Sequence, residues 1–174
     1  GIRWNRVHQD DGSIDLVYYR GVIDHCIANG VEICINVGPI RVFRWPEDHV
    51  PRSVLQSLPA VPPKKAAIQA GSPLADASID YLDRLVATLK KEYSASDLAA
   101  VKMVQVENEP FYLMGENEWT ISPSHLENAA QQVHDAFPDA EILLTTAGRL
   151  NMTAIRDVIA RLQGSDAVND QAGL

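Results

Sequence analysis

Cysteine, positive charge and long hydrophobic runs are scarce in this sequence, and each scarcity excludes a class of protein. The 174 residues include two cysteines, too few for a disulfide-stapled scaffold. Lys and Arg total 15 against 23 Asp and Glu, and no basic cluster exceeds a pair, so we expect no nucleic-acid partner. No apolar run approaches the roughly 18 residues of a membrane-spanning helix, so we expect no membrane partner.

The start of the chain leaves localisation open, because neither an initiator methionine nor a signal-peptide pattern precedes the first apolar run at Gly1. Cys26 and Cys34 fall in apolar runs, which predicts two buried free thiols. The remaining composition, with 46% hydrophobic and 22% charged residues, is typical of a globular protein. The length suits one domain with a sizeable core.

Strand-like and helix-like segments alternate along the chain. β-branched residues at period two predict a strand at 31–37, and apolar residues at helical spacing predict helices at 16–27 and 74–93. Two serine–proline pairs mark helix starts, at Ser72 and Ser122, because each is a capping serine followed by a first-turn proline. The other predicted elements are strands at 1–7, 101–106, 141–146 and from 167, and helices from 122 and at 155–162.

Repeated β-α units with apolar strands predict an α/β fold with a parallel sheet and right-handed crossovers. Two architectures fit this pattern: an open doubly wound sheet, and part of an eight-stranded (β/α)8 barrel. No Gly-rich phosphate loop follows any strand, which argues against a nucleotide-binding open sheet. Because a complete barrel needs about 250 residues, the barrel interpretation makes this chain a partial TIM barrel.

Residues 38–72 interrupt the alternation, with no clear strand and one short helical stretch at 53–58. Seven of the ten prolines lie between Pro39 and Pro73. A long loop in a compact domain is commonly functional, and this one leaves the carboxyl end of a strand, where α/β folds bind ligands. The alternative is a proline-stiffened surface excursion.

The segment Gln105-Val106-Glu107-Asn108-Glu109-Pro110 carries the most pointed chemical signal. It closes the strand predicted at 101–106, so an amide and a carboxylate face the rim where barrels bind substrates. Glu109 is therefore a candidate catalytic acid. The alternative is a helix-entry acid that precedes a turn proline.

The order of these segments resembles the clan of retaining glycoside hydrolases built on (β/α)8 barrels, particularly its galactosidase and cellulase-like branches. In that clan the fourth strand ends in Asn-Glu, often followed by Pro, as residues 108–110 do here. Residues 2–7 are similar to the second strand, and 33–39 with the aromatic loop 44–51 resemble the third. Residues 145–148 are similar in kind to the ending of the fifth strand. The resemblance implies one incomplete catalytic domain over 1–174, lacking strand 1 and strands 6–8.

The resemblance also implies roles for individual residues. It makes Glu109 the general acid/base and gives Asn108 a hydrogen bond to the sugar 2-OH. The nucleophilic Glu of the clan stands at the end of strand seven, outside this chain, so 1–174 alone is expected to be inactive. Arg6, in preference to Arg3, is the candidate for holding that nucleophile ionised.

Three further side chains, in segments that follow strands, are candidates to contact the sugar. Trp45 is the best aromatic platform, with packing of its loop as the alternative. His49 can hydrogen-bond a hydroxyl or stand as an exposed loop histidine. Trp119 can contact the sugar, although packing is the favoured interpretation.

The function predicted by the resemblance is hydrolysis of O-glycosidic bonds in a β-linked oligo- or polysaccharide with retention, without a metal or other cofactor. The expected partners are the carbohydrate substrate and the remaining barrel segments of the same polypeptide. Two alternatives stay open. One is a metal-dependent, sugar isomerase-like barrel with Glu107, Glu109 and His8 as ligands, and the other is a non-catalytic sugar-binding relative.

Overall fold

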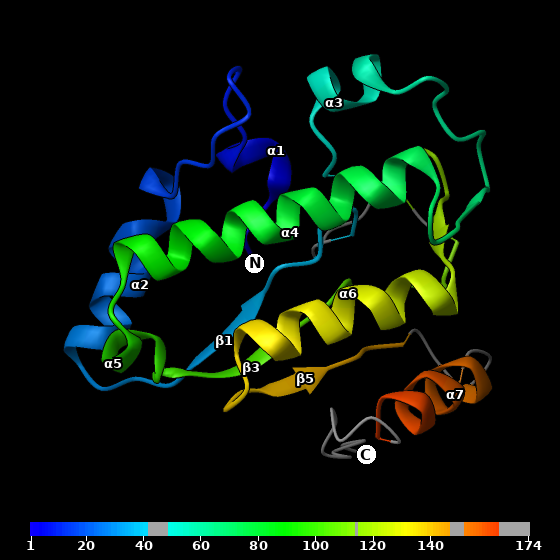
Figure 1. The fold of residues 1–174 in the computed structure, drawn as a ribbon. Helices are drawn as coiled ribbons and strands as arrows, with labels where there is room; N and C mark the ends of the chain where they lie inside the picture. The colour runs from blue at the N-terminus through cyan, green and yellow to red at the C-terminus, as the bar shows by residue number, and fades with distance from the viewer. Residues whose placement is uncertain (42–48, 114, 147–151, 164–174) are drawn as a thin grey trace.

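Three parallel strands and the helices that connect them make up the centre of the molecule (Figure 1). The computed structural model describes residues 1–41, 49–113, 115–146 and 152–163. The sheet has the order β1-β3-β5, with both pairs parallel, and its strands are β1 (Ile33–Asn36), β3 (Val101–Gln105) and β5 (Glu141–Leu143). The predicted parallel α/β alternation is confirmed.

Helices precede, connect and follow these strands. They are α1 (Trp4–Val7), α2 (Val17–Ala28), α3 (Arg52–Ser57), α4 (Pro73–Glu92), α5 (Ala95–Leu98), α6 (Pro123–Ala136) and α7 (Met152–Gln163). The two serine–proline starts are confirmed, because the Ser72 and Ser122 side chains accept hydrogen bonds from the backbone N–H groups of Ala75 and His125. In Figure 1, α4 and α6 lie side by side on the same side of the sheet. None of the helices in the described ranges is long and apolar enough to span a membrane.

The core lies between this helical layer and one face of the sheet. Ile35, Val104 and Ile142 are in register across the three strands, and all are buried. Because strand side chains alternate between faces, the neighbouring row Asn36, Gln105 and Leu143 takes the opposite face. One face of the sheet is therefore apolar, and the other carries polar groups.

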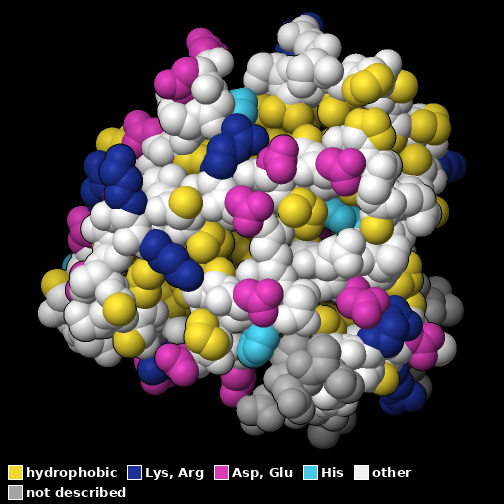
Figure 2. Space-filling view, in the orientation of Figure 1, with side chains coloured by type: hydrophobic (Ala, Val, Ile, Leu, Met, Phe, Trp, Pro, Cys, Tyr) yellow, Lys and Arg dark blue, Asp and Glu magenta, His cyan; other side chains and the backbone are white. Residues whose placement is uncertain are grey.

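The solvent face of α4 carries charged side chains of both signs (Figure 2). Asp76, Asp80 and Asp83 are exposed there, while the leucines of the same helix are buried. The amphipathic pattern thus keeps the charged side chains of this helix out of the core.

The predicted strand at 1–7 is wrong beyond its first residues. The Ile2 N–H donates to the Asn36 carbonyl at 2.8 Å, but the chain then turns into α1, where the His8 N–H donates to the Trp4 carbonyl. Trp4 and Val7 are both fully buried. Residues three apart share a face on a helix and point to opposite faces on a strand, so burial of both favours the helical turn.

The prediction of two buried thiols is also wrong. Both cysteines are free, as predicted, but Cys26 is only partly buried and Cys34 is exposed. Cys34 pairs with Met103, in the row of the sheet that faces away from the helices. An apolar run predicts burial on both faces of a strand, but the described residues leave Cys34 exposed on the face away from the helices.

The proline-rich segment contains a strand that the sequence did not predict. β2 (Ala67–Ile68) pairs in parallel with β4 (Thr120–Ile121), while α3 matches the predicted short helix. The pairing joins the long loop that follows β1 to the loop that follows β3. The two loops therefore form one structure beyond the carboxyl ends of the strands.

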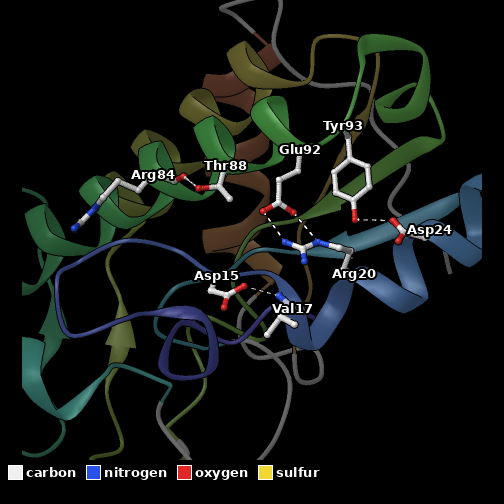
Figure 3. A network of polar contacts seen from close by, with 8 residues as sticks. All are labelled: Asp15, Val17, Arg20, Asp24, Arg84, Thr88, Glu92 and Tyr93. Atoms are coloured by element: carbon white, nitrogen blue, oxygen red, sulfur yellow. Dashed lines mark hydrogen bonds and ion pairs between the residues drawn. The ribbon is translucent and has the colours of Figure 1, made fainter.

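A polar network joins α2 to α4 (Figure 3). The Arg20 guanidinium donates to both carboxylate oxygens of Glu92, at 2.9 and 3.1 Å. Beside it, the Tyr93 hydroxyl donates to Asp24 at 3.0 Å. Burial and this hydrogen bond raise the pKa of Tyr93 to about 12. The network fixes the register of α2 against the end of α4.

A buried histidine links α4 to α6. The Ser78 hydroxyl donates to the Ala75 carbonyl at 2.7 Å and lies 3.0 Å from His125 Nε2. Because the single hydroxyl proton is already used, Nε2 carries the hydrogen and donates to Ser78. Burial disfavours the imidazolium, and it lowers the pKa of His125 to about 4, with Asp76 partly offsetting the effect.

This pKa predicts a loss of stability in acid. At pH values between the ordinary histidine pKa of about 6.5 and the lowered pKa, His125 binds a proton in the unfolded chain but not in the folded chain. Stability is therefore fully present above pH about 6.5 and falls toward pH 4, by up to about 3 kcal/mol. Urea unfolding at several pH values measures this loss.

Two variants isolate the contribution of His125. His125→Gln keeps an N–H donor for Ser78 and removes the titration, so its stability should fall less steeply between pH 6.5 and 4. His25→Gln, at an exposed position on α2, should retain the steepness of the parent protein. Equal steepness in His125→Gln and the parent would contradict the prediction.

Candidate active site

Glu107 anchors the loop after β1 to the loop after β3. Its side chain is 1% exposed, and its carboxylate accepts hydrogen bonds from the backbone N–H groups of Ile40 and Arg41. The two loops approach so closely that a Cβ on Gly38 would lie 2.6 Å from the Glu107 N and Cα atoms. Glu107, the first acid of the segment 105–110, therefore holds the two loops together.

Arg41 strengthens the same junction. Its side chain is buried, and its guanidinium donates to the backbone carbonyls of Tyr112 and Trp119, the second at 2.8 Å. Arg41 is not among the residues predicted for the site, because nothing in the local sequence distinguishes a buried arginine from a solvated one. Both of its carbonyl partners are more than 70 positions away.

Asn108 and Glu109 lie just beyond this anchor, at the carboxyl end of β3. The Asn108 N–H donates to the Arg41 carbonyl at 2.7 Å, and the Glu109 N–H donates to the Thr145 hydroxyl at 3.0 Å. Both side chains are half-buried. The structure thus brings together the two residues of the predicted site, beside the end of β5.

The backbone around the motif takes an uncommon conformation. Glu107 has φ 55° and Glu109 has φ 48°, in the left-handed region that costs a residue with a side chain on the order of 1–3 kcal/mol. Such strain persists where surrounding contacts hold it in place, and it clusters at functional sites. Here the Glu107 carboxylate and Thr145 supply those contacts.

A stacked aromatic pair joins α1 to α4 in the core. Trp4 of α1 and Tyr81 of α4 are fully buried, with ring centroids 4.8 Å apart. Burial raises the pKa of the Tyr81 hydroxyl well above its usual value, and the charges of Tyr19 and Glu107 raise it further.

The other predicted contacts lie elsewhere or are closed off. Arg6 is exposed on α1, so its role toward a nucleophile stays a prediction, and Trp45 lies outside the described residues. His49 is fully buried and its backbone bonds to Ile40 and Asn5, so the expectation of an exposed loop histidine is wrong. Trp119 is also fully buried.

Trp119 packs between the two long loops. Its indole N–H donates to the Pro63 carbonyl at 3.1 Å, and it directly precedes β4. Its ring has no exposed surface, which agrees with packing, the favoured interpretation of this residue. A contact between Trp119 and a sugar stays a prediction.

The metal-centre alternative lacks a ligand set. Among the described residues, no group of three or more His, Cys, Asp and Glu side chains could hold a metal ion. The Glu107 carboxylate, one of the three proposed ligands, already accepts two backbone N–H groups.

Three parallel strands adjacent in chain order, with α4 and α6 as crossovers on the same side, define part of a (β/α)8 barrel. Solved structures share this fold. A GH10 endoxylanase from a sugarcane soil metagenome is 12% identical over 95% of this chain and 44% of its own, with a TM-score of 0.60. Xylanase 10B from Thermotoga maritima is 15% identical over 97% and 47%, with a TM-score of 0.61.

A third structure contains a bound sugar. The intracellular xylanase of Thermoanaerobacterium saccharolyticum JW/SL-YS485, solved as a mutant with xylotriose, is 14% identical over 95% of this chain and 52% of its own, with a TM-score of 0.61. This chain spans about half the length of these proteins. No family model and no curated protein sequence matches it. The predicted partial barrel fold is confirmed.

Proposed function

We propose that residues 1–174 are part of the catalytic barrel of a retaining glycoside hydrolase that cleaves a β-linked oligo- or polysaccharide. One observation carries the proposal. Asn108 and Glu109 are fixed next to each other at the carboxyl end of the central strand of a partial barrel, by bonds to Arg41 and Thr145. Barrel enzymes of this type assemble their sites at this rim.

Glu109 acts as the general acid/base of this reaction. A nucleophilic carboxylate about 5–5.5 Å away attacks the anomeric carbon while Glu109 gives its proton to the leaving oxygen. Glu109 then removes a proton from the water that hydrolyses the glycosyl-enzyme. Asn108 hydrogen-bonds the sugar 2-OH, an interaction that strengthens in the transition state.

The nucleophile belongs to barrel segments outside this chain, which forms an incomplete domain without strand 1 and strands 6–8. The length of the structural neighbours, about twice that of the segment they share with it, supports this proposal. So does α2, which exposes Val17, Tyr18 and Val22 by 65–70%. A group of exposed apolar side chains marks a surface that packs against something else, and we assign it to the remaining segments.

The substrate class to test first is a β-1,4-linked xylo-oligosaccharide, since a neighbouring structure is described as an endo-β-1,4-xylanase and others contain xylotriose and xylotetraose. The full-length protein is incubated with xylotetraose, and the first product is followed by proton NMR. Release of the β-anomer before mutarotation is expected. Initial release of the α-anomer would contradict retention.

The rival functions predict different results in the same assay. Activity lost on chelation with EDTA would favour the metal-dependent enzyme. Binding of xylotetraose without hydrolysis would favour the non-catalytic sugar-binding relative. For the proposed hydrolase, EDTA should leave the rate unchanged.

A further inference from the structure

Gln105 and Thr145 lie next to each other across the sheet, on the face opposite the helices. Gln105 is the last residue of β3 and pairs with Leu143 of β5, and Thr145 is two residues further on, on the same face. Gln105 Nε2 lies 3.1 Å from the Thr145 hydroxyl oxygen. Neither residue is among those predicted to form the site.

Gln105 fixes the orientation of the Asn108 amide. Its Nε2 lies 3.3 Å from the Glu107 carbonyl oxygen, which can only accept, so the atom at this position must be the nitrogen. The same nitrogen lies 3.2 Å from Asn108 Oδ1 and 3.1 Å from Thr145 Oγ1, so its two hydrogens are shared among three acceptors and the Asn108 oxygen faces a donor. Asn108 therefore turns its oxygen toward Gln105 and leaves its NH₂ group to donate to a ligand.

Thr145 fixes the backbone of Glu109. Its hydroxyl oxygen accepts from the Glu109 N–H at 3.0 Å and from Gln105 Nε2 at 3.1 Å, which uses both of its acceptor sites. The first of these bonds holds Glu109 in the left-handed conformation, with φ 48°. The direction in which the Glu109 carboxyl leaves the chain depends on that conformation.

We propose that Gln105 and Thr145 are positioning residues, the first for the Asn108 amide and the second for the Glu109 carboxyl. The inference rests on the proposed function. It assigns two separate effects on catalysis, because one residue acts on the contact to the sugar ring and the other on proton donation to the leaving group.

Thr145 is tested in the full-length protein with glycosides of different leaving groups. Thr145→Val keeps the shape and removes the acceptor, whereas Thr145→Ser keeps the hydroxyl. Thr145→Val should lower kcat/KM by about 100-fold on poor leaving groups, as expected when a catalytic group is displaced by about 1 Å. Activated dinitrophenyl glycosides, which need little proton donation, should be affected much less. Thr145→Ser should restore the parent pattern.

Gln105→Leu should lower kcat/KM equally for good and poor leaving groups, because the 2-OH contact does not depend on the leaving group. Its effect should disappear on substrates whose sugar lacks that hydroxyl. Circular dichroism melting of each variant checks that the fold is retained.

Glu109→Gln in the same series separates this inference from the function on which it rests. If Glu109→Gln is equally slow on all leaving groups, the proposed function fails and the inference with it. If Glu109→Gln depends on the leaving group but Thr145→Val matches Thr145→Ser on every substrate, positioning by Thr145 is overturned alone. A Gln105→Leu effect that persists without the 2-hydroxyl would overturn positioning by Gln105.

Discussion

Glu109→Gln in the full-length protein should lower kcat on glycosides with poor leaving groups by about 10²–10⁴-fold, the range that general acid catalysis contributes. Gln has nearly the same shape and no transferable proton, so the loss measures proton donation and not packing. A dinitrophenyl leaving group departs without protonation, and the first step on such substrates should be affected much less. Steady-state kinetics on paired natural and activated substrates measures the difference.

A nearby acid provides the matched control. Glu116 lies on the same loop and is exposed, so Glu116→Gln should keep activity within a few-fold of the parent on both substrates. Equal loss on poor and activated leaving groups in Glu109→Gln would contradict the role as acid. Glu107→Gln is unsuited as a control, because it removes one of two buried acceptors for Ile40 and Arg41.

The elements that the sequence predicts correctly are those set by local physics. Ser72 and Ser122 start helices because each caps an N-terminus and precedes a proline with a suitable φ. The strand that carries Val104 was predicted from adjacent apolar residues, without any distant contact. The position of Asn108 and Glu109 at its end follows directly.

The anchoring role of Glu107 could not be predicted from the sequence. Glu107 and Glu109 stand two residues apart at the same strand end and look equivalent. The partners that bury Glu107 lie 66 and 67 positions earlier in the chain, and no local pattern identifies them. The anchoring role of the Glu107 carboxylate is therefore a property of tertiary structure.

The pairing of the two long loops was not predicted for a related reason. Prolines and polar residues predicted an extended loop, but β2 and β4 pair across more than 50 positions. That pairing buries Trp119 in the structure formed by the two loops. Aromatic residues after a strand are equally suited to bind sugar or to pack a loop, and only the pairing decides between the two.

Gly38→Ala should disrupt the junction on which the whole site is built. A Cβ at this position would lie 2.6 Å from the Glu107 N and Cα atoms and 2.9 Å from the Arg41 carbonyl oxygen. All three are backbone atoms, which cannot rotate away as a side chain can. Relief requires the loops after β1 and β3 to separate, which weakens the bonds from Ile40 and Arg41 to the Glu107 carboxylate.

The expected cost is about 3 kcal/mol in the free energy of unfolding, the upper end for overpacking a tight site, and it is measured by urea unfolding at neutral pH. Activity of the full-length protein should fall as well, because Asn108 is bonded to the displaced Arg41 carbonyl. Gly21→Ala is the matched control, since a Cβ there meets nothing within 4 Å. In the middle of a helix that change should be neutral or stabilising by up to about 1 kcal/mol. If Gly38→Ala were as stable and active as Gly21→Ala, the close approach of the two loops would not be what fixes the site.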